Sequence, residues 1–366
     1  MENSSSGFAS PFSKWVIAIF IALHFSLGLS QVPALFILGD SLADNGNNNN
    51  LYTLAKANYY PYGIDFYQGP TGRFCNGRTI LDMLGEKLGL PYPPPYADQL
   101  TSGSRLLGGV NYASAAGGIL DETGRHFGAR FSLSQQVLNF EKNLNDLRNL
   151  IGAGNITAYL AKSIVFVVFG SNDYINNYLL PNLYNSSSSY NPQDYADLLL
   201  NHYTRQILAL YSLGLRKFLL AGVGPLGCIP NQLARGIAPP GRCVDSVNQM
   251  VGPFNVGLRS LVDQLNSNHP EAIFVYGNTY GALGDMLNTP AAYGFNVINA
   301  ACCGIGRNQG QITCLPLQVP CTDRNQYLFW DAFHPTEAAN AFVAQRAYSG
   351  PPNDVYPINV QQMALK

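Results

Sequence analysis

The sequence predicts an α/β fold, a three-layer α/β/α sandwich in which helices cover both faces of a parallel sheet. Short apolar runs rich in β-branched residues alternate with longer segments that place apolar residues at helical spacing. Each short run is apolar at nearly every position, which is typical of parallel strands buried on both faces. Strands that alternate with helices along one chain indicate a sheet covered on both sides.

Five of these runs are expected to be strands, at 34–38, 110–113, 164–169, 218–221 and 273–276. Helices are expected between and after them, at 79–88, 133–150, 192–213, 247–268, 280–287 and about 336–348. In sheets of this kind the functional site lies at the carboxyl ends of the strands. The turns after the first and third runs are polar and contain glycine, so the chemistry is expected there.

The composition excludes several classes of protein. Hydrophobic residues make up 47% of the 366 residues, which is enough for a sizeable core and argues against disorder. Only 12% of the residues are charged, and the 21 basic and 22 acidic side chains leave a formal net charge of −1. Lys and Arg form no stripe, so nucleic acid is a poor candidate for a partner.

The N-terminus has the pattern of a signal peptide. Lys14 precedes an apolar run at 15–25, and Gly28-Leu29-Ser30 places small residues at the −3 and −1 positions of a cleavage site. A membrane anchor is the alternative interpretation, but the run is short for a span and two polar residues interrupt it. We therefore expect residues 1–30 to be removed and residues 31–366 to form a single domain.

Cysteine usage agrees with export. The chain has seven cysteines, Cys75, Cys228, Cys243, Cys302, Cys303, Cys314 and Cys321. None belongs to a Cys-x-x-Cys pair, which disfavours a zinc site or a thioredoxin-like motif. Cys228 and Cys243 bracket a loop rich in Pro and Gly, and a disulfide there would contribute about 3 kcal/mol in the chain-entropy model. Cys302 or Cys303 could pair with Cys314 and Cys321 in either connectivity, which leaves Cys75 as the odd thiol.

Two sequons point to glycosylation. They are Asn155-Ile156-Thr157 and Asn185-Ser186-Ser187, and Asn155 and Asn185 are expected to receive glycans where they are exposed. Together with the leader they predict secretion to the extracellular space or cell wall. The vacuole is an alternative destination that is reached through the same leader.

The first expected strand ends in Gly39-Asp40-Ser41-Leu42. A serine just past a buried strand is held rigidly at the edge of the sheet, and Gly39 allows a sharp turn there. These features make Ser41 a candidate nucleophile. The alternative is that Ser41 only caps a following helix.

Two further turns offer donors for a developing oxyanion. The third strand ends in Gly170-Ser171-Asn172-Asp173, where Asn172 could donate a side-chain N–H. The second leads into residues 111–118, which end in Gly117-Gly118 and would let a backbone N–H approach a ligand closely. The alternatives are a turn or cap role for Asn172 and close packing at the glycines.

A base and its partner occur near the C-terminus, in Trp330-Asp331-Ala332-Phe333-His334-Pro335. A serine hydroxyl needs a base, and histidine is the usual one near neutral pH. The base needs an acidic partner that fixes its tautomer. Because Asp331 and His334 are three residues apart, one turn can bring the carboxylate to the imidazole.

These segments together resemble the sequence blocks of plant GDSL esterases/lipases, a branch of the SGNH hydrolase superfamily. Residues 39–48 resemble the first block, 111–118 the second, 170–173 the third and 331–335 the fifth, and 72–78 is similar to the plant subfamily. The resemblance covers essentially the whole chain after the leader, so residues 31–366 are expected to be one SGNH hydrolase domain. It implies a flavodoxin-like sandwich with a five-stranded parallel sheet.

The resemblance also implies a role for each candidate residue. Ser41 is the nucleophile and offers its backbone N–H to the oxyanion. Gly117 supplies a second backbone N–H and Asn172 a side-chain N–H. His334 acts as general base and then as general acid, and Asp331 orients it.

The implied function is that of a secreted serine esterase or lipase, which hydrolyses acyl esters of small molecules, lipids or polysaccharides through an acyl-enzyme. The chain has no Gly-x-Ser-x-Gly elbow, no His-Glu-x-x-His zinc motif and no phosphate-binding loop. We expect no cofactor and no metal. An acyltransferase or polyester synthase would use the same residues with an alcohol in place of water. A secreted binding protein without turnover is a third hypothesis.

Overall fold

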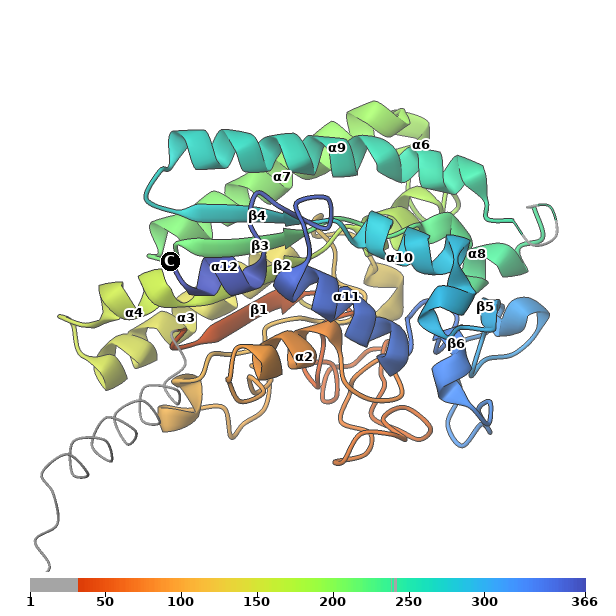
Figure 1. Ribbon diagram of the computed structural model, residues 1–366, viewed down its shortest axis with the longest axis horizontal. Coiled ribbons are helices and arrows are strands. Elements are labelled where there is room, and N and C mark those ends of the chain that lie inside the picture. Colours follow the sequence, from red (N-terminus) through yellow and green to blue (C-terminus); the bar gives the residue numbers. More distant parts are fainter. Residues whose placement is uncertain (1–31, 238, 240–241) are drawn as a thin grey trace, which may run out of the picture. The chain divides into compact units, whose positions relative to one another are not determined.

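The central sheet has five strands, β1 (Leu35–Gly39), β2 (Ile164–Val168), β3 (Lys217–Ala221), β4 (Ile273–Gly277) and β7 (Val355–Tyr356). A computed structural model describes residues 32–237, 239 and 242–366, so the predicted leader lies outside the described residues. The strand order is β1-β2-β3-β4-β7 (Figure 1). The first four strands run parallel, and the short β7 pairs antiparallel with β4.

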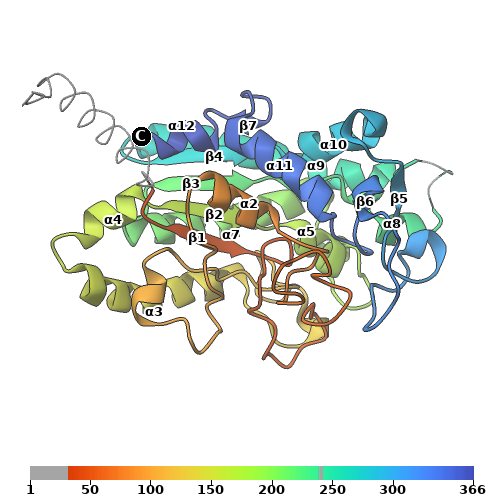
Figure 2. The ribbon, with the colours of Figure 1, turned by 60° about the horizontal axis from the view of Figure 1, so that its bottom comes forward.

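Helices cover both faces of this sheet (Figure 2). On one face lie α3 (Leu133–Ile151), α7 (Pro192–Ser212) and α9 (Asp245–Asn268), and on the other α2 (Ile80–Lys87), α11 (Glu337–Ser349) and α12 (Val360–Ala364). Side chains alternate along each strand, so Phe36 and Leu38 enter the first core while Leu35 and Ile37 enter the second. The predicted three-layer α/β/α fold is confirmed.

Shorter elements complete the described chain. The short helices are α4 (Ile156–Lys162), α5 (Ser171–Asp173), α6 (Ser186–Ser189), α8 (Pro230–Ala234) and α10 (Thr279–Asn288). A separate two-stranded parallel sheet joins β5 (Val297–Ala301) to β6 (Tyr327–Phe329). The six predicted helices correspond to α2, α3, α7, α9, α10 and α11, with ends that differ by at most two residues.

The expected strand at 110–113 differs from the structure. It runs beside β1, where the Ile37 N–H donates to Val110 and the Tyr112 N–H donates to Ile37, but it forms only isolated bridges. The Gly39 N–H donates to Oε1 of Gln136 at 2.9 Å rather than to this segment, whereas the Gly39 carbonyl still accepts from the Ser114 N–H. The fifth strand of the sheet is instead the antiparallel β7, which pairs with β4 at the opposite edge.

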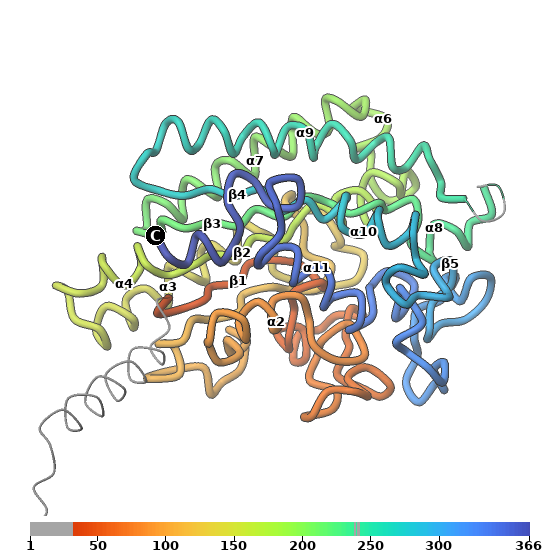
Figure 3. The backbone as a smooth tube through the Cα atoms, viewed as in Figure 1, coloured from red at the N-terminus to blue at the C-terminus, as the bar shows by residue number. Residues whose placement is uncertain are grey.

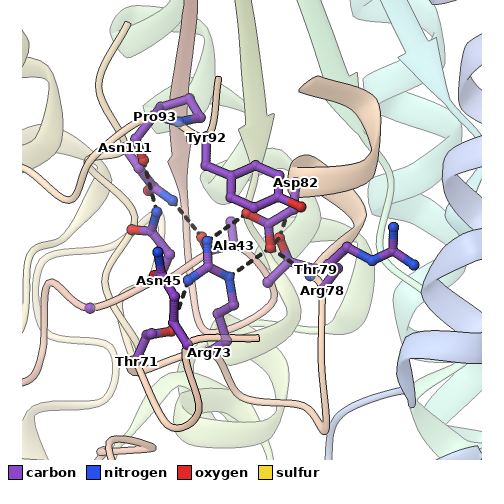
Figure 4. Close-up of polar contacts among 12 residues, drawn as sticks. Ala43, Asn45, Thr71, Arg73, Arg78, Thr79, Asp82, Tyr92, Pro93 and Asn111 are labelled. Carbon is purple, nitrogen blue, oxygen red and sulfur yellow. Dashed lines mark hydrogen bonds and ion pairs between the residues drawn. The ribbon is translucent and has the colours of Figure 1, made fainter. Parts of the chain in front are cut away.

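A buried ion pair fixes α2 beside the turn that follows β1 (Figure 4). The Arg73 guanidinium donates to both carboxylate oxygens of Asp82, at 2.7 Å each, and lies over the Phe66 ring. Asp82 also completes a capping box with Thr79 at the start of α2. Nδ2 of Asn111 donates to the carbonyl of Ala43 at 2.7 Å. The segment 72–78 thus ties α2 to the loops around the carboxyl end of β1.

Three disulfides are present, and all lie in the second half of the chain. Cys228 pairs with Cys243 as predicted. Of the connectivities that the sequence left open, the structure has Cys302–Cys321 and Cys303–Cys314, and Cys75 is a buried free thiol.

Asn155 and Asn185 are both exposed. Within the part of the chain that is described, no helix has the length and apolar character needed to cross a membrane.

Candidate active site

Ser41, His334 and Asp331 meet at the carboxyl edge of the sheet. Nε2 of His334 lies 2.7 Å from Oγ of Ser41, across 293 residues of sequence. Nδ1 of His334 lies 2.7 and 2.9 Å from the two oxygens of Asp331. The loop after β1 and the chain that leads into α11 reach the same side of the sheet (Figure 3). The structure therefore brings the three predicted residues together in one hydrogen-bonded chain.

The segment that contains Asp331 and His334 is fixed by its own backbone. The N–H groups of Phe333 and His334 each donate to Oδ1 of Asp331 at 2.9 Å, and the Trp330 N–H donates to the carbonyl of His334. This short turn follows β6 and leads to Thr336, the N-cap of α11. The carboxylate and the imidazole are thus oriented locally, as the three-residue spacing predicts.

The turn that presents Ser41 is held by a side chain from α3. The Gln136 amide accepts from the Gly39 N–H at 2.9 Å and donates to the Gly39 carbonyl at 2.8 Å. A Cβ at Gly39 would lie 3.0 Å from the Ala43 side chain and 3.1 Å from the Val168 carbonyl, so a larger residue would strain the turn. The Ser41 N–H has no acceptor among the residues that the structure describes.

Asn172 lies at the carboxyl end of β2 and lines the same pocket as Ser41. Its Nδ2 donates to the Gly117 carbonyl at 2.9 Å, which occupies one of its two N–H bonds. Nδ2 of Asn176 donates to Oδ1 of Asn172 at 2.6 Å, and this contact fixes the orientation of the amide. The second N–H bond of Asn172 is available for a substrate.

Gly117 lies against Asn172, but its N–H already has a partner. It donates to the Ser114 carbonyl at 3.1 Å, within a turn where Ala116 has a φ of 63°. An oxyanion bond from Gly117 requires this N–H to be shared with Ser114 or released from it. Ser41 and Asn172 are thus the better placed donors in this structure.

The model of the GDSL-like lipase/acylhydrolase family matches residues 35–347, a range that runs from β1 into α11 and includes both ends of the hydrogen-bonded chain. The protein belongs to this family. One similar protein, a GDSL esterase/lipase of Arabidopsis thaliana, is 65% identical over 338 residues, which cover 92% of this chain and 90% of the relative. A second from the same plant is 55% identical over 357 residues, with 96% and 93% covered. GDSL esterase/lipase 7 of that plant is 54% identical over 336 residues, with 91% and 92% covered.

Asp331 of this GDSL-family hydrolase is surrounded by donors. The Tyr62 hydroxyl donates to its Oδ2 at 2.5 Å, in addition to the contacts from His334 and the backbone. Burial alone raises the pKa of a carboxyl group, but the charge of His334 and hydrogen bonds from His334, Tyr62 and Phe333 outweigh it. The pKa of Asp331 therefore lies below its ordinary value, and the group is a carboxylate at neutral pH.

Asp40 directly precedes Ser41, and its pKa is shifted in the opposite direction to that of Asp331. Its Oδ1 accepts from the Leu42 N–H at 2.9 Å, while its Oδ2 is buried without a partner among the described residues. Burial raises the pKa of Asp40 to about 7, against the smaller opposite effects of the Leu42 N–H and the His334 charge. Asp40 is thus protonated below neutral pH.

Sequence reasoning missed the residues that support this site from a distance. Tyr62 lies 269 residues before Asp331, and Gln136 lies 97 residues after Gly39. Asp173 holds the loop beyond Gly117, because its carboxylate accepts from the N–H groups of Ile119 and Leu120. Asp173 lies in α5, a few residues after β2, and its place in the segment 170–173 was the available signal for one of them. Among the described residues, no cluster of three or more His, Cys, Asp or Glu is placed to hold a metal.

Proposed function

We propose that this chain hydrolyses carboxylic esters through an acyl-enzyme formed on Ser41. Its family makes it a carboxylic ester hydrolase, and the triad, the covalent intermediate and secretion are the proposed parts. One observation supports the mechanism most directly, the unbroken chain of hydrogen bonds from Ser41 Oγ through His334 to Asp331. Nucleophile, base and orienting carboxylate in this order are the arrangement that activates a serine.

In the first step, Ser41 Oγ attacks the carbonyl carbon of the ester while Nε2 of His334 accepts its proton. Asp331 stabilises the imidazolium that forms, and its low pKa keeps it charged for this role. Negative charge develops on the carbonyl oxygen, where the Ser41 N–H and the free N–H of Asn172 are available to it. One such donor is worth roughly 3–4 kcal/mol in the transition state. His334 then protonates the departing alcohol oxygen, which leaves the acyl group on Ser41.

In the second step, His334 takes a proton from a water molecule, whose oxygen attacks the acyl carbonyl. The same donors stabilise the second oxyanion. When this intermediate collapses, the proton returns from His334 to Ser41 Oγ and the carboxylic acid departs. An alcohol in place of water would give a new ester by the same steps.

Export is supported by the covalent chemistry of the chain. Three disulfides are stable in an oxidising compartment and rare in a reducing one. Asn155 and Asn185, the sequon asparagines, are exposed and so accessible to glycosylation. We therefore propose that the mature enzyme acts outside the cell or in a compartment reached by the same route.

The test is hydrolysis of p-nitrophenyl esters by the glycosylated mature protein, beside Ser41→Ala and the control Ser104→Ala at an exposed serine. Wild type and Ser104→Ala are expected to turn over, and Ser41→Ala to lose nearly all activity. Product analysis with an added alcohol separates the reactions, because free acid supports hydrolysis and a new ester supports acyl transfer. Normal turnover by Ser41→Ala contradicts the mechanism, and binding without turnover by the wild type would favour a binding protein.

A further inference from the structure

A short apolar loop, residues 315–320, lies on the surface between two disulfide-bonded cysteines. Its sequence is Leu-Pro-Leu-Gln-Val-Pro. Cys314 before it pairs with Cys303, and Cys321 after it pairs with Cys302. We propose that this apolar loop inserts into an uncharged lipid surface and docks the protein there. The proposal goes beyond ester hydrolysis and does not depend on it, because docking needs no turnover.

The apolar loop turns its hydrocarbon outward and its polar side chain inward. Leu317 is 85% exposed and Val319 is 88% exposed, which places them among the most exposed large apolar side chains of the described residues. Between them, the Gln318 amide accepts from the Leu315 N–H at 3.1 Å and donates to the carbonyl of the buried Gly304. This is the reverse of the usual preference in a folded protein, where amides face water and leucine is buried.

The backbone of Leu317 is unfavourable for a leucine. Its φ is 63°, in the left-handed region that glycine and asparagine adopt more readily. Its N–H donates to the Tyr60 carbonyl at 2.8 Å, and this contact helps to hold the conformation. Neither backbone preference nor burial explains a leucine at this position. We therefore look for its role outside the fold, in a contact with a partner.

The apolar loop is rigid before anything binds to it. A disulfide fixes each end to the adjacent pair Cys302 and Cys303, and the Cys321 N–H donates to the Cys302 carbonyl at 2.8 Å. Pro316 and Pro320 further restrict the backbone. A rigid loop keeps its apolar side chains from folding back onto the protein, and it binds a partner without the free-energy cost of ordering the loop.

The charge around the apolar loop favours an uncharged partner. No charged residue occurs from 308 to 322. Just after this segment, the Arg324 guanidinium donates to both carboxylate oxygens of Asp65, at 2.5 and 2.7 Å, so the two charges compensate each other. Just before it, Arg307 lines a separate cavity with Leu233 of α8. Anionic lipids are attracted by clusters of basic residues, and the loop has none of its own.

A lipid surface suits these side chains better than a protein does. A stable protein interface needs roughly 20–30 residues on each side, whereas the apolar loop offers only a few protruding side chains. Lipid accepts such side chains one by one, and each apolar group that becomes buried adds to binding. Tyr60, beside the loop and 52% exposed, has an apolar ring with a polar hydroxyl, which is typical of residues at a lipid–water interface.

Docking through the apolar loop would bring the candidate active site near the lipid. Oγ1 of Thr313, directly before Cys314, lies 3.3 Å from the Tyr62 hydroxyl, which donates to Asp331 at 2.5 Å. In Figure 1 the chain between β5 and β6, which contains the loop, lies beyond the carboxyl ends of the central strands. The surface that the loop binds and the triad are therefore at the same end of the sheet.

The experiment measures flotation of the mature glycosylated protein with vesicles of phosphatidylcholine. The parent is the Ser41→Ala form, so that turnover plays no part. Leu317→Asn and Val319→Gln are added to it separately, and either can decide the outcome if the other fails to fold. Asparagine adopts the left-handed conformation readily. The matched control is Val256→Gln, at a side chain of α9 that is 70% exposed. Thermal melts confirm that each variant is folded.

We expect the parent to float with the vesicles and each loop variant to partition at least about tenfold more weakly, the factor that burial of one such side chain is worth. Val256→Gln should match the parent, and neither anionic phosphatidylglycerol nor added salt should strengthen binding. A parent that does not float, loop variants that bind like the parent, or binding that requires anionic lipid would overturn the proposal. So would self-association of the parent that Leu317→Asn abolishes, because the loop would then join two copies of the chain.

Failure of the proposed function gives a different result. The wild type and the Ser41→Ala parent should float equally, whatever the nucleophile is. Ester turnover that survives Ser41→Ala would contradict the mechanism and leave the flotation result unchanged. Conversely, Leu317→Asn and Val319→Gln in the wild-type background should hydrolyse dissolved p-nitrophenyl acetate at the wild-type rate, because neither side chain belongs to the candidate active site.

Discussion

The two sides of the Ser41–His334 hydrogen bond differ in how well their polar groups are satisfied. On the base side, the Asp331 carboxylate accepts from His334, Tyr62 and two backbone N–H groups. On the nucleophile side, three groups make no hydrogen bond within the described residues. They are Oδ2 of Asp40, the Ser41 N–H and one N–H of Asn172. Asp40 and Asn172 are buried, as Asp331 and His334 are, so burial alone does not explain the difference.

The difference indicates what each side is for. The base side is complete without a substrate, so its charge and geometry are fixed in advance. In the proposed mechanism, the unused donors of the nucleophile side stabilise the negative charge that develops during acyl transfer. Unsatisfied groups are expensive to bury and rare, and under this proposal the substrate supplies the partner of the two donors. The first three predictions test this contrast through catalysis, from the largest expected effect to the smallest, and the fourth tests it through stability.

Asp331→Asn should have the largest effect, because it acts on the completed side. The amide cannot stabilise the imidazolium and favours the wrong tautomer of His334, so kcat should fall by about 10³–10⁴. Steady-state kinetics with a p-nitrophenyl ester measures this. Asp197→Asn, at an exposed carboxylate on α7, is the control and should match the wild type. A loss of less than about tenfold would mean that the Asp331 charge is not needed.

Asn172→Ala removes one unused donor from the nucleophile side. We expect kcat to fall by about 10²–10³, with KM nearly unchanged, because the N–H acts on the transition state rather than on the bound ester. Asn145→Ala, at an exposed position on α3, is the control. A rise in KM with normal kcat would instead make Asn172 a residue that binds the substrate uniformly.

Tyr62→Phe removes one of the donors to Asp331 and should lower kcat by about tenfold or less, since the other donors remain. The pKa of Asp331 should rise. A carboxyl with a depressed folded pKa contributes stability above its unfolded pKa, and loses it as pH falls through the folded value. As the pH is lowered, the variant should therefore lose activity and stability at a higher pH than the wild type does. Tyr59→Phe, whose hydroxyl donates to the Cys314 carbonyl, is the control. If both variants lose activity and stability at the same low pH, Tyr62 does not lower the pKa of Asp331.

Asp40→Asn tests the carboxyl whose oxygen has no partner. Because the folded pKa of about 7 exceeds the ordinary 3.8, the folded state keeps a proton that the unfolded state releases. Stability should therefore decrease as pH rises between these values, by up to about 4 kcal/mol, and stay lower above them. The asparagine variant should lack this decrease. Urea unfolding at about pH 5 and pH 8 measures it. A variant with the same pH dependence as the wild type would contradict the assignment.

The local parts of the site could be predicted from the sequence, because their signals are short. Ser41 and Asn172 follow the predicted strands that became β1 and β2, and Asp331 and His334 are an acid and a base three residues apart on one turn. The supporting residues could not be predicted. Tyr62 reaches Asp331 from a loop, and nothing in a loop's sequence specifies which distant carboxylate its hydroxyl will contact.

The strands show the same limit. Five parallel strands were predicted because short, nearly continuous apolar runs indicate burial on both faces, and four of these runs are β1 to β4. The run at 110–113 has that pattern too, but Gln136 competes for the Gly39 N–H and interrupts the ladder. The actual fifth strand, Val355–Tyr356, has only two residues and no pattern to detect. Segment 110–113 lies beside β1 and β7 beside β4, so each edge of the sheet depends on contacts that the short segment itself does not encode.

The central claim is that Ser41 is the nucleophile and that the completed base side activates it. Labelling with a fluorophosphonate, followed by mass spectrometry of the peptides, tests it most directly, because this reagent leaves a stable adduct on an activated serine. We predict one adduct, on the peptide that contains Ser41, formed much more slowly in Asp331→Asn and absent in Ser41→Ala. An adduct on another serine, or ester turnover without labelling of Ser41, would contradict the claim.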